Sequence, residues 1–166
     1  MDKEKELDLF SMAKSDALRL LSARPRSLDE LKKRLETKKY PADVVAHTLE
    51  LLKSQGLLDD KRFAKLVASS SISAKPVGRS EVVRKLKAKG VDASTISETL
   101  QGLEDYDEKK AAKEAVSLKF SKMTGISKEK KKSRIFGFLK RRGFASDTIF
   151  KVMDELFQGV NQDDLG

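Results

Sequence analysis

Apolar residues occupy the same positions in three successive segments of this chain, which repeat at intervals of 51 and then 53 residues. The eighteen positions are Leu31, Leu35, Tyr40, Val45, Leu49, Leu52, Val82, Leu86, Val91, Ile96, Leu100, Leu103, Ile135, Leu139, Phe144, Ile149, Met153 and Leu156. All of them are apolar, although hydrophobic residues make up only 39% of the chain. Repeats of this length are typical of stacked helical units, which present a surface for binding rather than a pocket for chemistry.

Each copy of the repeat has the signals of a helix, a tight turn and a second helix. In the first copy, Ser27 followed by Glu30 is a capping-box pattern, which predicts a helix over about 27–38. Pro41 suits the first turn of a second helix that runs to about residue 54. The sequence therefore predicts a helical hairpin in each copy.

A third helix is predicted after each of the first two hairpins. After the first, either Asp59 or Asp60 has the short carboxylate that caps a helix. After the second, a helix begins near Asp107. We expect Ala111, Ala115 and Leu118 on its buried side, with Lys109 and Lys113 opposite.

The turn inside each hairpin is expected to differ between the first copy and the other two. Gly90 and Gly143 end the first helices of the second and third copies, where a left-handed residue is needed. The first copy has Lys39 at this position, and a left-handed conformation costs lysine of the order of 1 kcal/mol. We therefore expect a different turn at Lys39.

These signals predict an all-α fold of three tandem three-helix repeats, about nine helices in total, which form an elongated curved rod. We expect a charged N-terminal tail over 1–14, an extra helix with the first repeat over 15–74, a second repeat over 75–123, a truncated third repeat over 124–157 and a polar C-terminal tail over 158–166.

The net charge of +9 is concentrated in one stretch of the chain. Residues 109–142 contain 13 basic residues and only two acids, Glu114 and Glu129. A concentrated positive field attracts polyanions such as nucleic acid, acidic protein surfaces or anionic lipid. The alternative is a solvated face that only keeps the protein soluble.

The residues expected to face a polyanion are basic side chains of this stretch. They are Lys109, Lys110, Lys113, Lys128, Lys130, Lys131, Lys132, Arg134, Lys140, Arg141 and Arg142, with Arg79, Arg84 and Lys87 as candidates to extend the surface. Phe136, Phe138 and Phe144 lie among them and are interpreted as core residues, although aromatic rings beside basic groups can also stack on unpaired bases.

Residue types that carry catalysis are sparse. The chain has no cysteine, and His47 is its one histidine, which we interpret as a residue at a helix surface or boundary. No glycine-rich phosphate loop is present, and no apolar run is long enough for a secretory signal or a membrane span. We expect a cytoplasmic protein that is not an enzyme and needs no cofactor or metal.

Three groups of residues resemble the RecX family, bacterial modulators of the RecA recombinase. They are the stretch ALRLLSARPRSLDELKKRL, the motif LLDDKRFA, and KPVG followed by LKAKGV and FLKRRGF. The signature residues that match are Leu58, Asp59, Asp60, Arg62, Phe63, Ala64, Gly78, Gly90, Arg142, Gly143 and Phe144. The similarity covers about residues 15–157. It departs at the serines of 69–71 and at the polar positions that follow Gly78.

The resemblance implies a regulator that binds along the RecA filament on single-stranded DNA. Such a protein modulates, in most cases inhibits, the ATPase, strand-exchange and coprotease activities of the recombinase in DNA repair and the SOS response. The resemblance implies no cofactor and no catalysis, and we expect a monomer with at most weak direct contact to DNA. A stand-alone basic helical DNA-binding protein is the alternative, and a scaffold for an acidic protein is a third reading.

Overall fold

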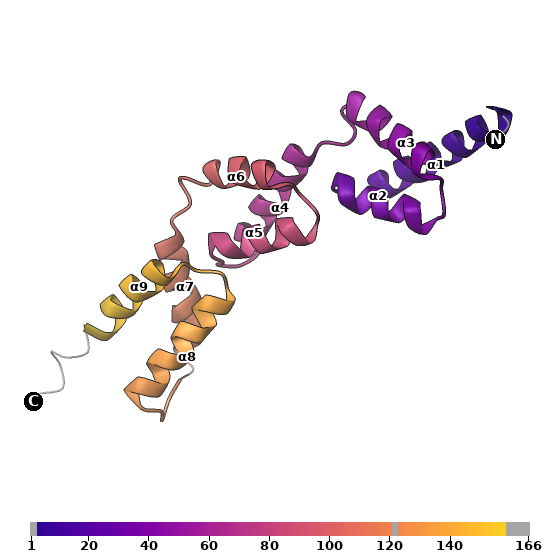
Figure 1. Cartoon of the computed structure of the whole chain (residues 1–166). Helices are drawn as coiled ribbons and strands as arrows, with labels where there is room; N and C mark the ends of the chain where they lie inside the picture. The colour runs from indigo at the N-terminus through magenta and orange to yellow at the C-terminus, as the bar shows by residue number, and fades with distance from the viewer. Residues whose placement is uncertain (1–2, 121–122, 159–166) are drawn as a thin grey trace, which may run out of the picture. The chain divides into compact units, whose positions relative to one another are not determined.

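The structure is a computed structural model that describes residues 3–120 and 123–158 of the chain (Figure 1). Within these residues it consists of helices without a strand, as the sequence predicts. The helices are α1 (Lys3–Ala23), α2 (Leu28–Thr37), α3 (Ala42–Ser54), α4 (Asp60–Ala74), α5 (Arg79–Ala88), α6 (Ala93–Gln101), α7 (Glu108–Phe120), α8 (Lys128–Arg141) and α9 (Ser146–Gln158). None of these described helices is long and apolar enough to span a membrane.

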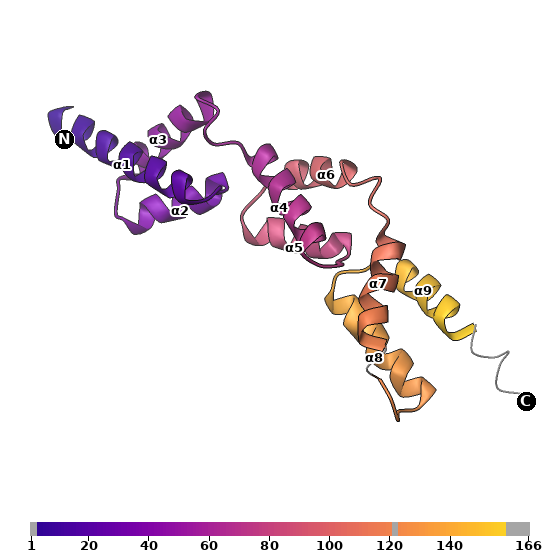
Figure 2. The same cartoon turned by 180° about the vertical axis from the view of Figure 1, so that it is seen from behind.

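The chain divides into two compact units. The N-terminal unit comprises residues 1–66 and 86–99, and in it α1 packs against α2 and α3 (Figure 1). The C-terminal unit comprises residues 67–85 and 100–166, and in it α7 packs against α8 and α9 (Figure 2). Helices α4, α5 and α6 contribute residues to both units. The rod shape expected from the sequence stays a prediction.

The eighteen repeated apolar positions form the core. Thirteen are buried, and the other five, Tyr40, Leu100, Leu103, Met153 and Leu156, are half-buried. One core cluster joins residues of α2 and α3 to Ala17 of α1. Another joins residues of α8 and α9 to alanines of α7. The repeat read from the sequence is therefore the repeat of the core.

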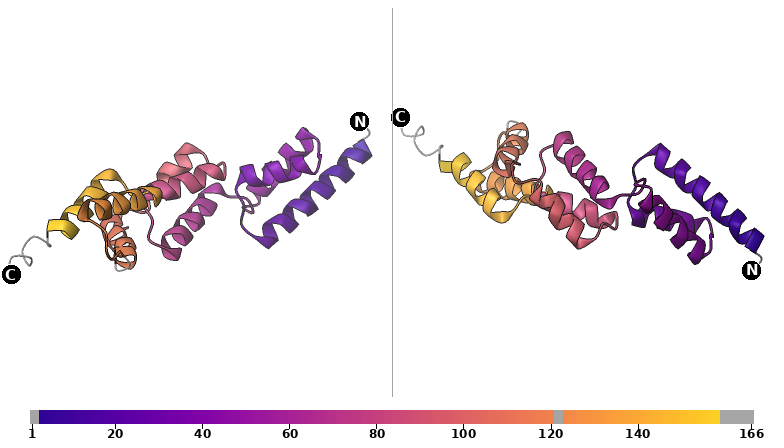
Figure 3. Two further views of the ribbon diagram at one scale, coloured as in Figure 1. Left: turned by 90° about the horizontal axis from the view of Figure 1, so that it is seen from below. Right: turned by 90° about the horizontal axis from the view of Figure 1, so that it is seen from above.

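The packing groups the helices differently from the sequence prediction. The segment expected to be a charged tail over 1–14 is helical from Lys3 onward, because α1 is 21 residues long (Figure 3, the long indigo helix). Ala13 and Ala17 are fully buried, which places one face of α1 in the core. Helix α1 thus completes a three-helix group with α2 and α3, and α7 completes one with α8 and α9. Residues 159–166, within the predicted polar tail, lie outside the described part.

The caps at the starts of α2 and α4 are linked. The capping box of Ser27 and Glu30 is present as predicted. Asp59 caps α4, because its Oδ1 accepts hydrogen bonds from the backbone N–H groups of Lys61 at 2.9 Å and Arg62 at 3.1 Å. The carboxylate of Asp60 instead accepts from the Leu28 N–H at 2.8 Å, so it satisfies a free donor in the first turn of α2.

One predicted helix face is wrong. Leu118 of α7 is exposed, and Ala112 and Val116 are buried together with Ala111 and Ala115. The buried face of α7 is therefore turned away from Leu118. Small side chains fill this face because α7 packs on both α8 and α9.

The hairpin turn has the same left-handed backbone in all three copies, contrary to the prediction for Lys39. The φ angle is 65° at Lys39, 70° at Gly90 and 79° at Gly143. The glycines are needed for a second reason. A Cβ atom on Gly90 would lie 2.3 Å from the Cβ of Asp29, and one on Gly143 would lie 2.3 Å from the backbone nitrogen of Glu81. Lys39 is exposed, so its side chain has room.

A close contact of this kind, here called a glycine joint, occurs once in each compact unit. In the first joint the start of α2 lies on the turn at Gly90, and the Ser27 hydroxyl donates to the Lys89 carbonyl. In the second joint the start of α5 lies on the turn at Gly143. There the Gly78 N–H donates to the Arg142 carbonyl at 2.9 Å.

The second joint is a contact between two stretches of backbone. The Ser80 N–H donates to the Gly143 carbonyl at 3.2 Å. A Cβ atom on Gly78 would lie 2.0 Å from that same carbonyl oxygen, which explains why the KPVG motif ends in glycine. A side chain at either glycine would separate the two backbones. At the turn of the first copy, Lys38 and Tyr40 contact Asp16 of α1, and the Lys39 side chain is exposed.

The joints predict how strongly three glycine-to-alanine substitutions lower the free energy of unfolding. Gly56→Ala should cost about 1–2 kcal/mol, because Gly56 has φ 67° and nothing within 4 Å of a Cβ atom. Gly90→Ala and Gly143→Ala should cost roughly 1–3 kcal/mol more, because a clash adds to the strain. Urea denaturation followed by circular dichroism measures the three values. Equal costs for all three variants would contradict the joint.

A second prediction concerns the contact between α1 and the first hairpin turn. The Asp16 carboxylate accepts hydrogen bonds from Lys38 Nζ at 2.6 Å and the Tyr40 hydroxyl at 2.8 Å, which lower the pKa of Asp16 from 3.8 to about 2. Asp16→Asn should therefore lower the free energy of unfolding by about 1–2 kcal/mol at neutral pH. Because the charged form is favoured in the folded state, this difference should hold above about pH 4 and shrink as pH falls towards 2. Thermal unfolding of both proteins across this range measures it. A difference that does not depend on pH would rule out the charge as its cause.

Candidate functional site

The solvent-facing side of α8 has a line of basic side chains. Lys130, Arg134 and Arg141 are separated by four and seven residues, which places them in one row along a helix. All three are exposed, and the row spans about 16 Å at 1.5 Å per residue. We call it the cationic ridge. The start of α8 is held by Ser127, whose side chain accepts from the Lys130 N–H.

Other basic residues near α8 lie over aromatic rings. Lys131 Nζ is 5.5 Å from the centre of the Phe120 ring, and Lys132 Nζ is 5.2 Å from that of Phe157. Such cations cover apolar surface with their stems and are attracted to the ring face. These two lysines of the predicted polyanion-facing set therefore also help to cover the core.

Two lysines of the predicted surface share one acidic partner inside the C-terminal unit. Lys109 and Lys113 of α7 both form ion pairs with Glu155 of α9. Hydrogen bonds from these lysines lower the pKa of Glu155, so the carboxylate is charged at neutral pH. They face α9, not the side away from the core that the sequence predicted, and they do not extend the ridge.

The remaining candidates are placed around the ridge. Lys110 is exposed on α7, and Lys128 is half-buried at the start of α8. Lys140 donates to the Ser146 hydroxyl at 2.9 Å. The Arg142 guanidinium lies 4.9 Å from the centre of the Phe138 ring and donates to the Pro76 carbonyl at 3.0 Å. Eight of the eleven candidates thus lie on α8 or at its end, and three of them, Lys130, Arg134 and Arg141, form the ridge.

The aromatic residues among these cations belong to the core and its edge. Phe144 is buried, and Phe136 and Phe138 are half-buried and pack against the same core cluster. Phe136 also lies 5.7 Å from Phe150, centre to centre. Phe150 is exposed, and the sequence analysis did not single it out because it lies outside the repeated pattern.

The residues of the LLDDKRFA motif have mainly structural roles. Leu58, Phe63 and Ala64 are buried, and Asp59 and Asp60 cap helices as described. Lys89 Nζ lies 5.8 Å from the centre of the Phe63 ring, which ties the motif to the first joint. The Arg62 side chain is exposed. The motif therefore connects α4 to the start of α2.

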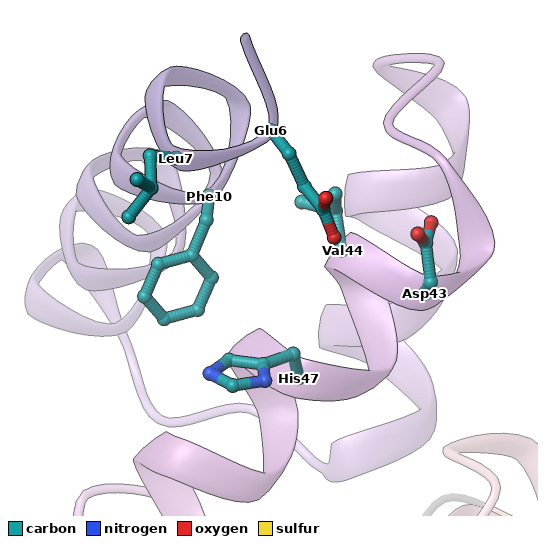
Figure 4. Close-up of a pocket in the computed structure, with 6 residues that line it drawn as sticks. All are labelled: Glu6, Leu7, Phe10, Asp43, Val44 and His47. Carbon is teal, nitrogen blue, oxygen red and sulfur yellow. The ribbon is translucent and has the colours of Figure 1, made fainter. Parts of the chain in front are cut away.

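A shallow pocket lies between α1 and α3, with a cavity volume of about 380 Å³. In Figure 4 the His47 imidazole lies beside the Phe10 ring, and their centres are 4.5 Å apart at an interplanar angle of 89°. The acidic side chains at its rim are Glu6 and Asp43. His47 is exposed on α3, as expected for a boundary residue. The sequence analysis missed this pocket because it placed the start of the first helix near residue 15.

Acidic side chains are not grouped into a metal site in the described part of the chain. No three His, Asp or Glu residues there lie together in a way that could hold a metal ion. What the described residues do gather is positive charge on and beside α8. This arrangement suits recognition of an anionic partner.

Comparison with known proteins agrees with the three-helix groups seen in the structure. Three family models match in order: the first RecX three-helix domain over residues 13–52, the second over 59–100 and the third over 105–153. Each matched range contains one helix before the hairpin, as the packing does. The third domain is therefore complete and not truncated.

Curated relatives and solved structures cover nearly the whole chain. A regulatory protein RecX of Chlorobium phaeobacteroides is 33% identical over 157 residues, which is 95% of this chain and 97% of the relative. Another, from Pelodictyon phaeoclathratiforme, is 37% identical over 128 residues, 77% of this chain and 78% of the relative.

Two crystal structures share the fold. RecX from Lactobacillus salivarius has a TM-score of 0.78 and 22% identity, and covers 90% of this chain and 97% of its own. A second structure, of a regulatory protein RecX, has a TM-score of 0.84 and 22% identity, and covers 93% and 80%. The fold, the three matched domains and the curated relatives agree, and the chain belongs to the RecX family of regulatory proteins.

Proposed function

We propose that this protein binds the RecA filament on single-stranded DNA and inhibits its ATPase, strand-exchange and coprotease activities. The observation that carries the proposal is the cationic ridge of Lys130, Arg134 and Arg141 on a chain of the RecX family. A nucleoprotein filament is a polyanion with a repeating surface. Three tandem domains suit such a partner, because contacts made by several domains raise avidity without one strong site.

The position of the ridge supports an anionic partner. Lys130 lies in the first turn of α8, where the positive end of the helix dipole disfavours a cation by about 0.3–1 kcal/mol. Among the described residues, no acid forms an ion pair with Lys130, Arg134 or Arg141, and Glu155 pairs with Lys109 and Lys113 of α7. An anionic filament would offset both costs. The protein would act as a monomer in the cytoplasm, without a cofactor.

Stand-alone DNA binding is the second candidate, and the same ridge supports it. The two functions differ in the partner that binds more tightly. A DNA-binding protein would bind bare single-stranded DNA as strongly as the filament, and its affinity would fall steeply with salt. A filament regulator would bind bare DNA weakly and the filament strongly. Co-sedimentation with each partner separates them.

Charge reversal on the ridge should weaken inhibition of the filament. We expect Lys130→Glu with Arg134→Glu to raise the concentration that half-inhibits RecA-coupled ATP hydrolysis about tenfold or more, because two attractions become repulsions. Circular dichroism should be unchanged, since both side chains are exposed. The matched control is Lys65→Glu with Lys151→Glu, which makes the same charge change at exposed positions of α4 and α9.

The same assay can contradict the proposal at two levels. Unchanged ATP hydrolysis with the wild-type protein, together with no co-sedimentation at low salt, would remove the filament as the partner. Equal inhibition by the ridge variant and the wild-type protein would keep the filament but remove the ridge from the contact.

A further inference from the structure

The second glycine joint forms a pocket whose lining is mostly cationic. Its cavity has a volume of about 250 Å³ and lies between the α4–α5 connection with the start of α5 and the end of α8. Lys75, Arg84, Arg141 and Arg142 line it with one carboxylate, Glu81. These five groups give the pocket a net charge of +3. All of its lining residues belong to the C-terminal unit.

The charges of this pocket are not balanced within the described part of the protein. Glu81 pairs with Arg84, at 2.7 Å between Oε2 and Nη2. Lys75, Arg141 and Arg142 form no ion pair with a described residue. Lys75 and Arg141 are also exposed, so both side chains are available to a ligand. The surplus of positive charge therefore comes from three side chains that converge on one cavity.

The first joint has the same geometry with a smaller surplus of positive charge, because two acids pair with its three basic groups. There Glu30, at the register of Glu81, pairs with Arg24 at 3.0 Å and with Lys89 at 3.2 Å. A second acid, Asp29, pairs with Lys33 at 2.7 Å. At the register of Asp29 the second joint has Ser80, and so it has lost one acid. The geometry that the two joints share does not require this surplus of positive charge. The surplus therefore distinguishes the second joint from the first.

The floor of the pocket favours a nucleotide over a simple carboxylate. Val77 is buried and Phe138 is half-buried, so part of the lining is apolar and strengthens electrostatic interactions. Guanidinium groups present a planar fork that matches phosphate oxygens, and they also stack on the flat faces of bases. Arg142 already lies over the Phe138 ring.

We propose that this pocket binds one backbone phosphate of single-stranded DNA, with Lys75, Arg141 and Arg142 as its ligands. Arg141 is also the last residue of the cationic ridge, so the pocket continues that row. The assignment deepens the proposed function, because single-stranded DNA is part of the filament. It names the group on the DNA that this chain would contact.

The test uses the full chain and a fluorescein-labelled oligothymidylate, with fluorescence anisotropy at several salt concentrations and without recombinase. Lys75→Gln with Arg141→Gln should weaken binding about tenfold and lower the slope of log affinity against log salt by about 1. Both residues are exposed, so the fold should be retained. Lys33→Gln with Lys151→Gln removes the same charge elsewhere and should have little effect.

A third variant should change affinity in the opposite direction. Glu81→Gln keeps the shape of the side chain, removes the one acid of the pocket and frees Arg84, so it should tighten binding of the oligonucleotide. Pyrophosphate should compete with the oligonucleotide for the wild-type protein and less well for the Lys75/Arg141 variant. A polyglutamate peptide should compete poorly.

The outcomes separate this proposal from the proposed function. An equal loss for the pocket and control variants, weaker binding by Glu81→Gln, or competition by polyglutamate equal to that by pyrophosphate would each overturn the phosphate site. Wild-type protein that binds the oligonucleotide through the pocket but leaves RecA-coupled ATP hydrolysis unchanged would overturn the filament regulator and keep the phosphate site.

Discussion

The contact that the rest of the structure depends on is the approach of a helix start to the left-handed turn of a later hairpin. At the second joint Gly78 and Gly143 bring two backbones within hydrogen-bonding distance, and no side chain fits between them. The donors at the start of a helix have no partner within that helix, and the carbonyls at the end of another have none either. The joint pairs free N–H donors at the start of one helix with free carbonyl groups at the end of another. It therefore fixes how consecutive hairpins meet within each compact unit.

The same joint has different chemistry in its two copies. In the first, burial raises the pKa of Glu30, but hydrogen bonds from Arg24 and Lys89 lower it to about 2, and both of these basic groups are ion-paired. In the second, Ser80 stands at the register of Asp29, and basic groups gather around Glu81. The geometry of the joint is common to both copies and supports the fold. The difference in charge is what gives the second copy a binding role in our account.

Local rules predicted much of the fold from the sequence. The eighteen repeated positions are the core, the capping box at Ser27 is present, and left-handed turns occur at Gly90 and Gly143. Rules of this kind depend on residues within a few positions of one another. The turn at Lys39 shows their limit. A left-handed conformation is unfavourable for lysine, yet Lys39 adopts it with φ 65° within the hairpin.

Contacts between distant parts of the chain could not be predicted in this way. The sequence does not say whether a helix packs on the hairpin before it or after it, so α7 was grouped with the second repeat although it packs on α8 and α9. Glu155 lies more than forty residues from Lys109 and Lys113, and its ion pairs with them turn two cations of the predicted surface towards α9. Lys75 was not singled out because only the joint brings it beside Arg141.

The most direct test of the account is amide hydrogen exchange at the second joint, measured by NMR on the full chain. The Gly78 and Ser80 amides donate to Arg142 and Gly143 across this joint. If the joint is a fixed part of the fold, both amides should exchange as slowly as those in the middle of α8, because they open only when the unit unfolds. Exchange at the rate of exposed amides, with α8 still protected, would show that the joint opens on its own and would contradict the account.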